Sequence, residues 1–239
     1  MVDFKELRKK SIGDAKQKVK ASVSKDMMII NAINNVEELE KSINVLSKRL
    51  REWFSLKNPE LERAVQDNEQ FVKVALVAKD EPTEMGAELG EEDEMAIKGL
   101  AVAAQGLVET KTFLLLYLEK TMAGYCRNVY AIAGATIGAK LLREAKGLQR
   151  LASIGASTVQ LLGAENALFR HIKSGARPPK YGHIFNHPLV SNARKEDRGK
   201  AARALADKIS ICARLDFFKG EFLADKYLKD LGEKFKKEQ

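Results

Sequence analysis

The chain has 239 residues and a formal net charge of +8, with 45% hydrophobic and 31% charged residues. This composition is too apolar for a disordered chain and too highly charged for a membrane protein. The charge is uneven, because residues 58–94 carry a net charge of −9 whereas residues 140–239 carry +10. The strong local basicity favours a polyphosphate partner.

Residues 1–25 are assigned as an N-terminal helical segment, and residues 26–57 carry a heptad repeat. One core position of the repeat is occupied by Ile29, Val36, Ile43 and Leu50, and the other by Ala32, Leu39, Leu46 and Trp53. We expect this helix to end near Lys57, because Pro59 cannot extend it.

The acidic insertion, residues 58–94, is expected to contain a shorter helix from Pro59 to Ala78 and a loop from Lys79 to Glu92. A second, weaker heptad run then covers residues 94–125. Its acidic start suits the positive end of the helix dipole.

Two amphipathic helices joined in this way most simply fold back as an antiparallel coiled-coil arm spanning residues 26–125. The arm is either a spacer within the domain or a dimerisation surface, and we favour dimerisation. The candidate dimerisation residues are Ile29, Val36, Leu39, Ile43, Leu46, Leu50 and Trp53.

Residues 126–220 have the pattern of a compact helical domain, and residues 221–239 that of a charged tail with a frayed helix. Helices are expected at 136–146, 147–152, 157–162, 164–173 and 198–218. The segment 174–193 contains three prolines and two glycines and is expected to be a loop.

Basic and aromatic side chains alternate along this loop and the helices beside it, a pattern suited to RNA because bases stack on aromatic and guanidinium planes while Lys and Arg contact phosphates. The candidate RNA-binding residues are Arg170, His171, Lys173, Arg177, Lys180, Tyr181, His183, Arg198, Lys200 and Arg203.

Several of these side chains also suit a purely structural role. Phe169 and Phe185 are expected in the core rather than in base stacking. Three histidines lack the cysteines and the short repeated spacing of a zinc site, so no metal and no cofactor are predicted. Cys126 and Cys212 are expected to be buried small hydrophobes, in keeping with a reducing compartment.

Several motifs resemble those of the Nop family, in the family's order and spacing. They are ASTVQLLGAENALFR at 156–170, PKYGHIF at 179–185, RGKAAR at 198–203 and ARLDFF at 213–218, with LREWFSL at 50–56 resembling the family's coiled-coil arm. The resemblance covers nearly the whole chain. Within the family, the sequence resembles the archaeal Nop proteins of box C/D small ribonucleoproteins.

The resemblance implies an all-α fold in which the long antiparallel coiled-coil arm precedes a compact Nop domain. It implies a scaffold that recognises box C/D guide RNA with a kink-turn together with a kink-turn-binding ribosomal-like protein. It further implies pairing with a second Nop molecule through the coiled coil, and support of RNA 2′-O-methylation by fibrillarin, in the cytoplasm of an archaeon or the nucleolus of a eukaryote.

Two departures from the family are expected to matter. The family's fibrillarin-docking domain has no counterpart in these residues, so fibrillarin binding is not transferred to them. Asn166 stands where the family usually has lysine, which removes one charge from the signature.

The sequence leaves other functions to consider. A protein–protein adapter with an incidental basic surface is the main alternative. A methyltransferase or other enzyme is disfavoured, because the sequence has no βαβ alternation, no glycine-rich nucleotide loop and no nucleophile–base motif. A DNA-binding helix-turn-helix is disfavoured by the long Pro/Gly loop.

Overall fold

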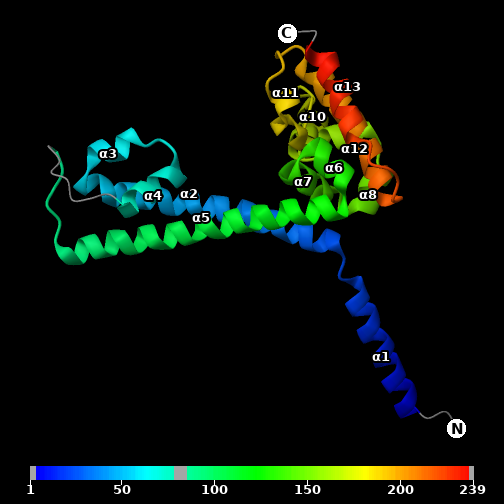
Figure 1. The fold of residues 1–239 in the computed structure, drawn as a ribbon, viewed down its shortest axis with the longest axis horizontal. Helices are drawn as coiled ribbons and strands as arrows, with labels where there is room; N and C mark the ends of the chain where they lie inside the picture. Colours follow the sequence, from blue (N-terminus) through cyan, green and yellow to red (C-terminus); the bar gives the residue numbers. More distant parts are fainter. Residues whose placement is uncertain (1–3, 78–84, 237–239) are drawn as a thin grey trace. The chain divides into compact units, whose positions relative to one another are not determined.

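The computed structural model describes residues 4–77 and 85–236, and every regular element in those two ranges is helical. The predicted all-α class is confirmed. Contacts divide the chain into two compact units. The first is Ala32–Tyr117, and the second combines Met1–Asn31 with Leu118–Gln239. Figure 1 labels the helices.

The first unit is built on two long helices, α2 (Lys25–Lys57) and α5 (Glu91–Tyr125), with α3 (Pro59–Ala64) and α4 (Asn68–Val77) between them in the chain. Within this unit α2 and α5 lie side by side and run in opposite directions (Figure 1). Leu50 and Phe54 of α2, Phe71 of α4 and Ala101 of α5 belong to one buried cluster. The predicted antiparallel arrangement is therefore confirmed for these segments.

The heptad prediction holds for one core position of α2 and only partly for the other. All four residues of the first position are buried, whereas at the second position Ala32 is buried, Leu39 and Leu46 are half-buried and Trp53 is 50% exposed. Ile33 and Phe54 are buried instead. A straight helix has 3.6 residues per turn, so its inner face drifts away from a strict seven-residue repeat.

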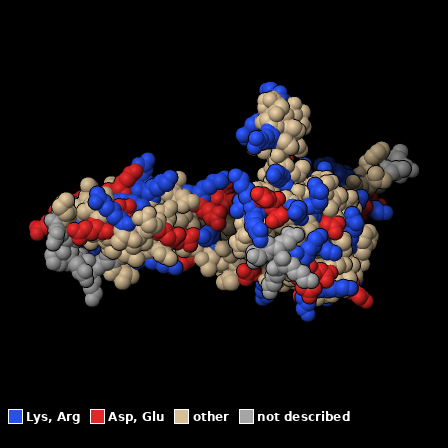
Figure 2. Space-filling model, turned by 90° about the horizontal axis from the view of Figure 1, so that it is seen from above, with Lys and Arg blue, Asp and Glu red and all other residues tan. Residues whose placement is uncertain are grey.

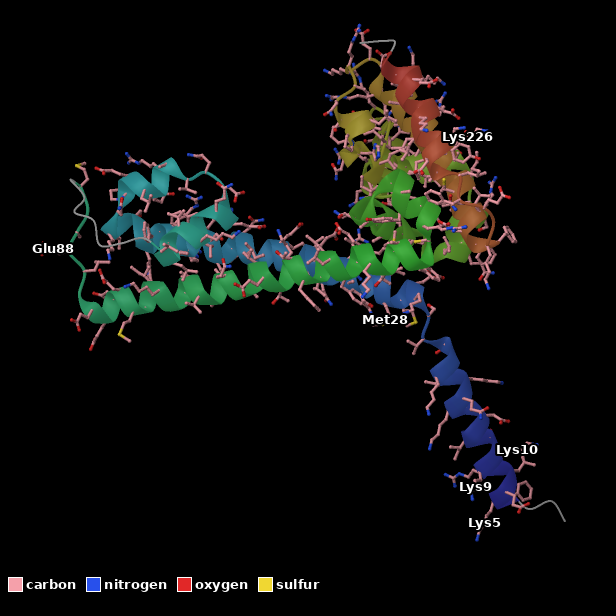
Figure 3. All side chains as sticks on the ribbon, in the orientation of Figure 1. Lys5, Lys9, Lys10, Met28, Glu88 and Lys226 are labelled. Atoms are coloured by element: carbon pink, nitrogen blue, oxygen red, sulfur yellow. The ribbon has the colours of Figure 1, made fainter. Side chains whose placement is uncertain are left out.

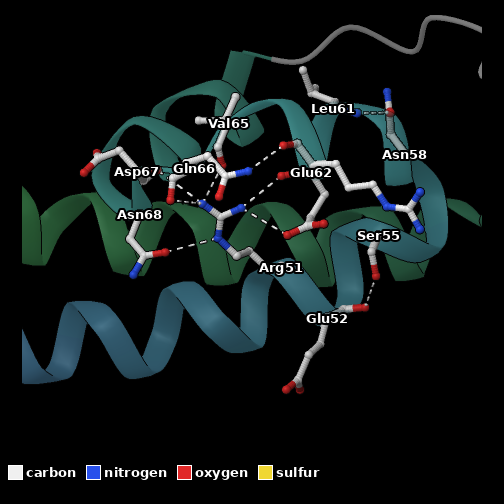
Figure 4. Close-up of polar contacts among 11 residues, drawn as sticks. Arg51, Glu52, Ser55, Asn58, Leu61, Glu62, Val65, Gln66, Asp67 and Asn68 are labelled. Carbon is white, nitrogen blue, oxygen red and sulfur yellow. Dashed lines mark hydrogen bonds and ion pairs between the residues drawn. The ribbon is translucent and has the colours of Figure 1, made fainter.

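The expected single helix from Pro59 to Ala78 is wrong within the described residues, because the helical conformation is interrupted between α3 and α4 at Val65–Asp67. The Arg51 guanidinium fills this break (Figure 4). It donates to the carbonyl oxygens of Val65 at 2.7 Å, Gln66 at 3.1 Å and Asp67 at 3.3 Å. Residues 78–84 of the expected helix end and loop lie outside the described ranges.

Within residues 4–77 and 85–236, one helix, α5, is long and apolar enough to cross a membrane by length and composition alone. Its first turn carries four acidic residues, Glu91–Glu94. Part of its apolar surface is core, because Ile97, Ala101 and Ala104 pack in the buried cluster with α2 and α4. Phe113 and Leu116 on α5 are exposed. The absence of a membrane partner stays a prediction.

The second unit contains α1 (Phe4–Ser22) and the helices that follow α5. These are α6 (Arg127–Ala133), α7 (Ala135–Ala145), α8 (Leu148–Ser153), α9 (Ala156–Leu161), α10 (Glu165–Ser174), the 3₁₀ turn η1 (His183–Asn186), α11 (Pro188–Ser191), α12 (Arg198–Phe217) and α13 (Ala224–Lys236). Helix α12 packs against α6, α8 and α9. Its inner face combines Leu205 and Ile209 with small residues that let neighbouring helices approach closely.

Three expectations for this unit needed correction. Helix α6 was not predicted. The expected loop at 174–193 contains η1 and α11. The C-terminal helix α13 is packed rather than frayed, because Ala224 and Leu231 are buried. The expected burial of Cys126 and Cys212 is confirmed.

A buried polar network joins the helices at one end of α12. The Asp216 carboxylate accepts hydrogen bonds from the Asn128 backbone N–H at 3.0 Å, its side-chain amide at 2.9 Å and the Val129 N–H at 2.8 Å. The Asn128 side-chain oxygen accepts in turn from Leu223 and Ala224. The ARLDFF motif therefore holds the starts of α6 and α13 in place, since buried amide groups must be paired.

Candidate nucleic-acid interface

An open groove lies between α9, the segment 175–182, the start of α12 and the end of α13. Its larger part has a volume of about 700 Å³ and shares Ser157, Gln160, Lys200 and Arg203 with an adjoining part of about 500 Å³. Helices α12 and α13 run antiparallel, which brings the start of one beside the end of the other (Figure 1). Segments far apart in the sequence therefore form one surface.

The groove is rich in cations. Lys180, Lys200, Arg203 and Lys234 line it, against the acidic Glu196 and Asp207. Lys200 forms an ion pair with Asp197 at 3.1 Å, but the lysine side chain is 70% exposed, so solvent screens the pair and the charge stays accessible. Figure 2 shows basic side chains over the visible face, with acidic ones between them.

The groove wall formed by the PKYGH segment is fixed to the end of α9. The Gln160 side chain donates to the Lys180 carbonyl at 2.6 Å, and the Gly182 N–H donates to the Gln160 carbonyl at 2.8 Å. A Cβ at Gly182 would lie 1.9 Å from the carbonyl oxygen of Leu162. Only glycine allows this close approach, which sets the position of Lys180 beside α12.

A second close approach places His183 beneath the turn that follows α9. Gly163 has a φ of +86°, and a Cβ there would lie 2.4 Å from the His183 ring. His183 Nε2 is 3.1 Å from Glu144 Oε1, and Arg143 also donates to that carboxylate. Burial raises the pKa of Glu144, but the hydrogen bonds and charges of His183 and Arg143 together outweigh it, so the pKa of the carboxyl is lowered overall.

The ten candidate RNA-binding residues fall into three groups. Lys180, Lys200 and Arg203 line the groove. Arg170, Lys173 and Arg177 are exposed on α10 and the segment after it. The remaining four, His171, Tyr181, His183 and Arg198, are half-buried and make contacts within the protein.

The four half-buried candidates make contacts that stabilise the fold around the groove. The Tyr181 and Phe185 rings are stacked with their centroids 4.8 Å apart. The central carbon of the Arg198 guanidinium lies 5.6 Å from the Phe185 centroid. Arg198 also donates to the carbonyls of Ala193 at 3.1 Å and Ser191 at 3.2 Å. His171 Nδ1 is hydrogen-bonded to the carbonyl oxygen of Ala176 just beyond α10. These contacts leave less of each side chain for a ligand, and a direct role in RNA binding stays a prediction for all four.

Helix α10 presents an exposed apolar patch, which includes one residue that was expected in the core. Phe169 is 69% exposed and Ile172 is 72% exposed, so the expected burial of Phe169 is wrong. Ala167, Leu168 and His171 form the half-buried side of the helix instead. Leu168, Ile172 and Phe169 lie within an arc of about 100° on α10, so periodicity marks one apolar face but does not show which of these side chains is buried.

Three residues of the groove were not among the predicted binding residues. Ser157 and Gln160 belong to the motif at 156–170 but were not expected to bind RNA, and Lys234 was assigned to a frayed tail. The alternation of Lys and apolar residues in α13 could have indicated that this helix packs and carries its lysines to a defined surface.

The comparison with protein families identifies the chain. The model described as "Nop: snoRNA binding domain, fibrillarin" matches residues 35–238. The chain belongs to the Nop family. A NOP5 family protein of Methanocaldococcus jannaschii is 39% identical over 234 residues, which cover 88% of this chain and 56% of that protein. Nucleolar protein 56 of Dictyostelium discoideum is 38% identical, over 85% of this chain and 43% of that protein.

The solved structures agree on the fold. The crystal structure of a fibrillarin/Nop5p complex matches with a TM-score of 0.60 and 24% identity, over 98% of this chain and 78% of that chain. At this identity the match shows the Nop fold alone. The chain spans about half the length of the curated relatives that it matches.

Proposed function

We propose that this Nop-family chain is a non-catalytic RNA-binding scaffold of a box C/D small ribonucleoprotein, which supports guided 2′-O-methylation by fibrillarin. The observation that carries the proposal is the basic groove, where Lys180, Lys200 and Arg203 converge from two elements on one open surface. Lysine and arginine around an open groove suit phosphate oxygens, whereas a small-molecule catalytic site is usually an enclosed apolar pocket. The description of the matching family as snoRNA-binding supports RNA as the polyanion.

The proposal includes a composite target of kink-turn RNA and a kink-turn-binding protein. Helix α10 supports this part, because exposed Phe169 and Ile172 lie on the same short helix as exposed Arg170 and Lys173. An apolar pair suits a protein surface, and the two cations suit the RNA backbone beside it. A partner that holds the RNA bent would present a preorganised surface, so docking would lose less entropy.

Pairing with a second Nop molecule through the coiled coil is also part of the proposal. Ile29, Val36, Ile43 and Leu50 are already buried within one chain. A second copy would therefore contact the side chains left accessible, of which Leu39, Leu46 and Trp53 belong to the predicted dimerisation set. Fibrillarin docking is not assigned to these residues. The relatives named as nucleolar proteins support a nucleolar location in a eukaryote, with the cytoplasm as the archaeal counterpart.

The groove can be tested by the salt dependence of binding to a box C/D kink-turn RNA. Lys200→Ala and Arg203→Ala should each weaken binding and lower the slope of log K against log salt by about 1, because each removes a phosphate contact. Lys226→Ala is the matched control, since Lys226 is an exposed α13 lysine outside the groove (Figure 3). Unchanged slopes for both groove variants would show that this end of α12 makes no phosphate contact with the RNA.

A further inference from the structure

Helix α1 carries a strong charge that the proposed function does not use. Residues 4–22 contain seven Lys or Arg and two acidic residues, and they precede the range 35–238 that matches the family model. Every described side chain of α1 is exposed. Figure 3 shows Lys5, Lys9 and Lys10 extending from this helix into solvent.

Four of the lysines lie on one face of α1. Lys5, Lys9, Lys16 and Lys20 are spaced by 4, 7 and 4 residues. At about 100° per residue these positions fall within an arc of about 60°, and at 1.5 Å per residue they extend over about 22 Å. Lys10 and Lys18 point away from this lysine stripe, roughly 110° and 170° from its centre.

The stripe is unfavourable for the helix on its own. Lys16 and Lys20 are like charges at i,i+4 spacing, an arrangement that destabilises a helix. None of the described side chains of α1 is buried to offset this repulsion, and most helical stability in proteins comes from packing of an apolar face. A ligand with regularly spaced negative charge removes the repulsion and favours the helical state.

We propose that the lysine stripe of α1 binds the phosphate backbone of double-stranded RNA without reading its sequence. Lysine is a flexible point charge that suits phosphate contacts. A duplex is favoured over a single strand because the stripe contains no aromatic side chain for base stacking. Phe4, the helix's one aromatic residue, lies about 100° or more from each lysine of the stripe.

This site goes beyond the proposed groove function and lies on a different element, so the two can fail separately. The test uses the full chain and a 24-base-pair RNA duplex without box C/D motifs. The stripe variant is Lys9→Ala with Lys16→Ala. The control is Lys10→Ala with Lys18→Ala, which also removes two positive charges from α1, but from outside the stripe.

The stripe variant should lower the salt slope of duplex binding by about 2, and the control should change it by much less. Wild-type helicity, followed by circular dichroism, should rise when duplex is added, and this rise should shrink in the stripe variant alone. Equal effects of both double variants would show a generic cationic surface and overturn the proposal. So would binding to phosphatidylserine vesicles that depends on Lys9 and Lys16 while duplex binding does not.

The groove variants separate this result from the proposed function. Lys200→Ala with Arg203→Ala should leave plain duplex binding by α1 largely intact while weakening the kink-turn complex. Loss of duplex binding in this variant, with no effect of Lys9→Ala and Lys16→Ala, would place duplex recognition in the groove and leave α1 without a role.

Discussion

Replacing Arg51 with methionine should destabilise the unit formed by residues 32–117 more than any surface change in it. The guanidinium also donates to the Asn68 side chain at 3.1 Å and to the Glu62 carboxylate at 3.1 Å, and it lies 4.2 Å from the centre of the Phe71 ring. The Arg51 side chain is only 15% exposed. Methionine keeps much of the packing but leaves several carbonyl oxygens between α3 and α4 without a donor.

The expected loss is about 3 kcal/mol in the free energy of unfolding. A buried acceptor left unpaired costs roughly 1–3 kcal/mol, and breaking a buried ion pair costs 3–5 kcal/mol, but some of these carbonyls lie near the surface and can bind water instead. Urea denaturation followed by tryptophan fluorescence measures this directly. Trp53 is the single tryptophan of the chain and belongs to the same unit.

Arg49→Met is the matched control, because Arg49 makes one exposed ion pair with Glu52 on the same helix. Such a pair is worth well under 1 kcal/mol, so the control should unfold near the wild-type midpoint. Equal unfolding midpoints for the two variants would refute the view that Arg51 holds the α3–α4 turn.

Three further predictions concern the second unit. Asp216→Ala should cost about 2–4 kcal/mol in urea denaturation, because three N–H donors lose their acceptor. Burial, followed by the nearby Asp216 charge, raises the pKa of Cys126 above its usual range and that of Cys212 to about 12, so neither thiol should react with Ellman's reagent at pH 8 until the protein unfolds. Glu144→Gln should lower stability at pH 7 and lose this effect as the pH falls below the usual titration range of glutamate. A carboxyl whose pKa is lowered by folding stabilises the protein only while it is ionised.

The long helices were predictable because their signals are local. The repeat in residues 26–57 and Pro59 set the length of α2, and the acidic run at Glu91–Glu94 marked the start of α5 within a few residues. The break at Val65–Asp67 was not predictable in this way. It is stabilised by Arg51, which lies more than ten residues earlier in the chain.

The candidate site shows the same division between local pattern and tertiary contact. Basic residue types indicated the surface near Lys200 and Arg203, and both line the groove. The pattern could not show that Arg198, on the same helix, turns toward the carbonyls of Ser191 and Ala193. Nor could it show that α13 returns to bring Lys234 to the groove. Both outcomes depend on the packing of distant segments.

The most direct test of the proposed function is a gel-shift titration of a box C/D kink-turn RNA with this chain, in the presence and absence of a kink-turn-binding protein. The proposal predicts that the chain binds the RNA–protein complex far more tightly than the RNA alone, and that Phe169→Ala reduces this difference. Equal affinity with and without the partner, varying with salt alone, would contradict composite recognition and favour an adapter with an incidental basic surface.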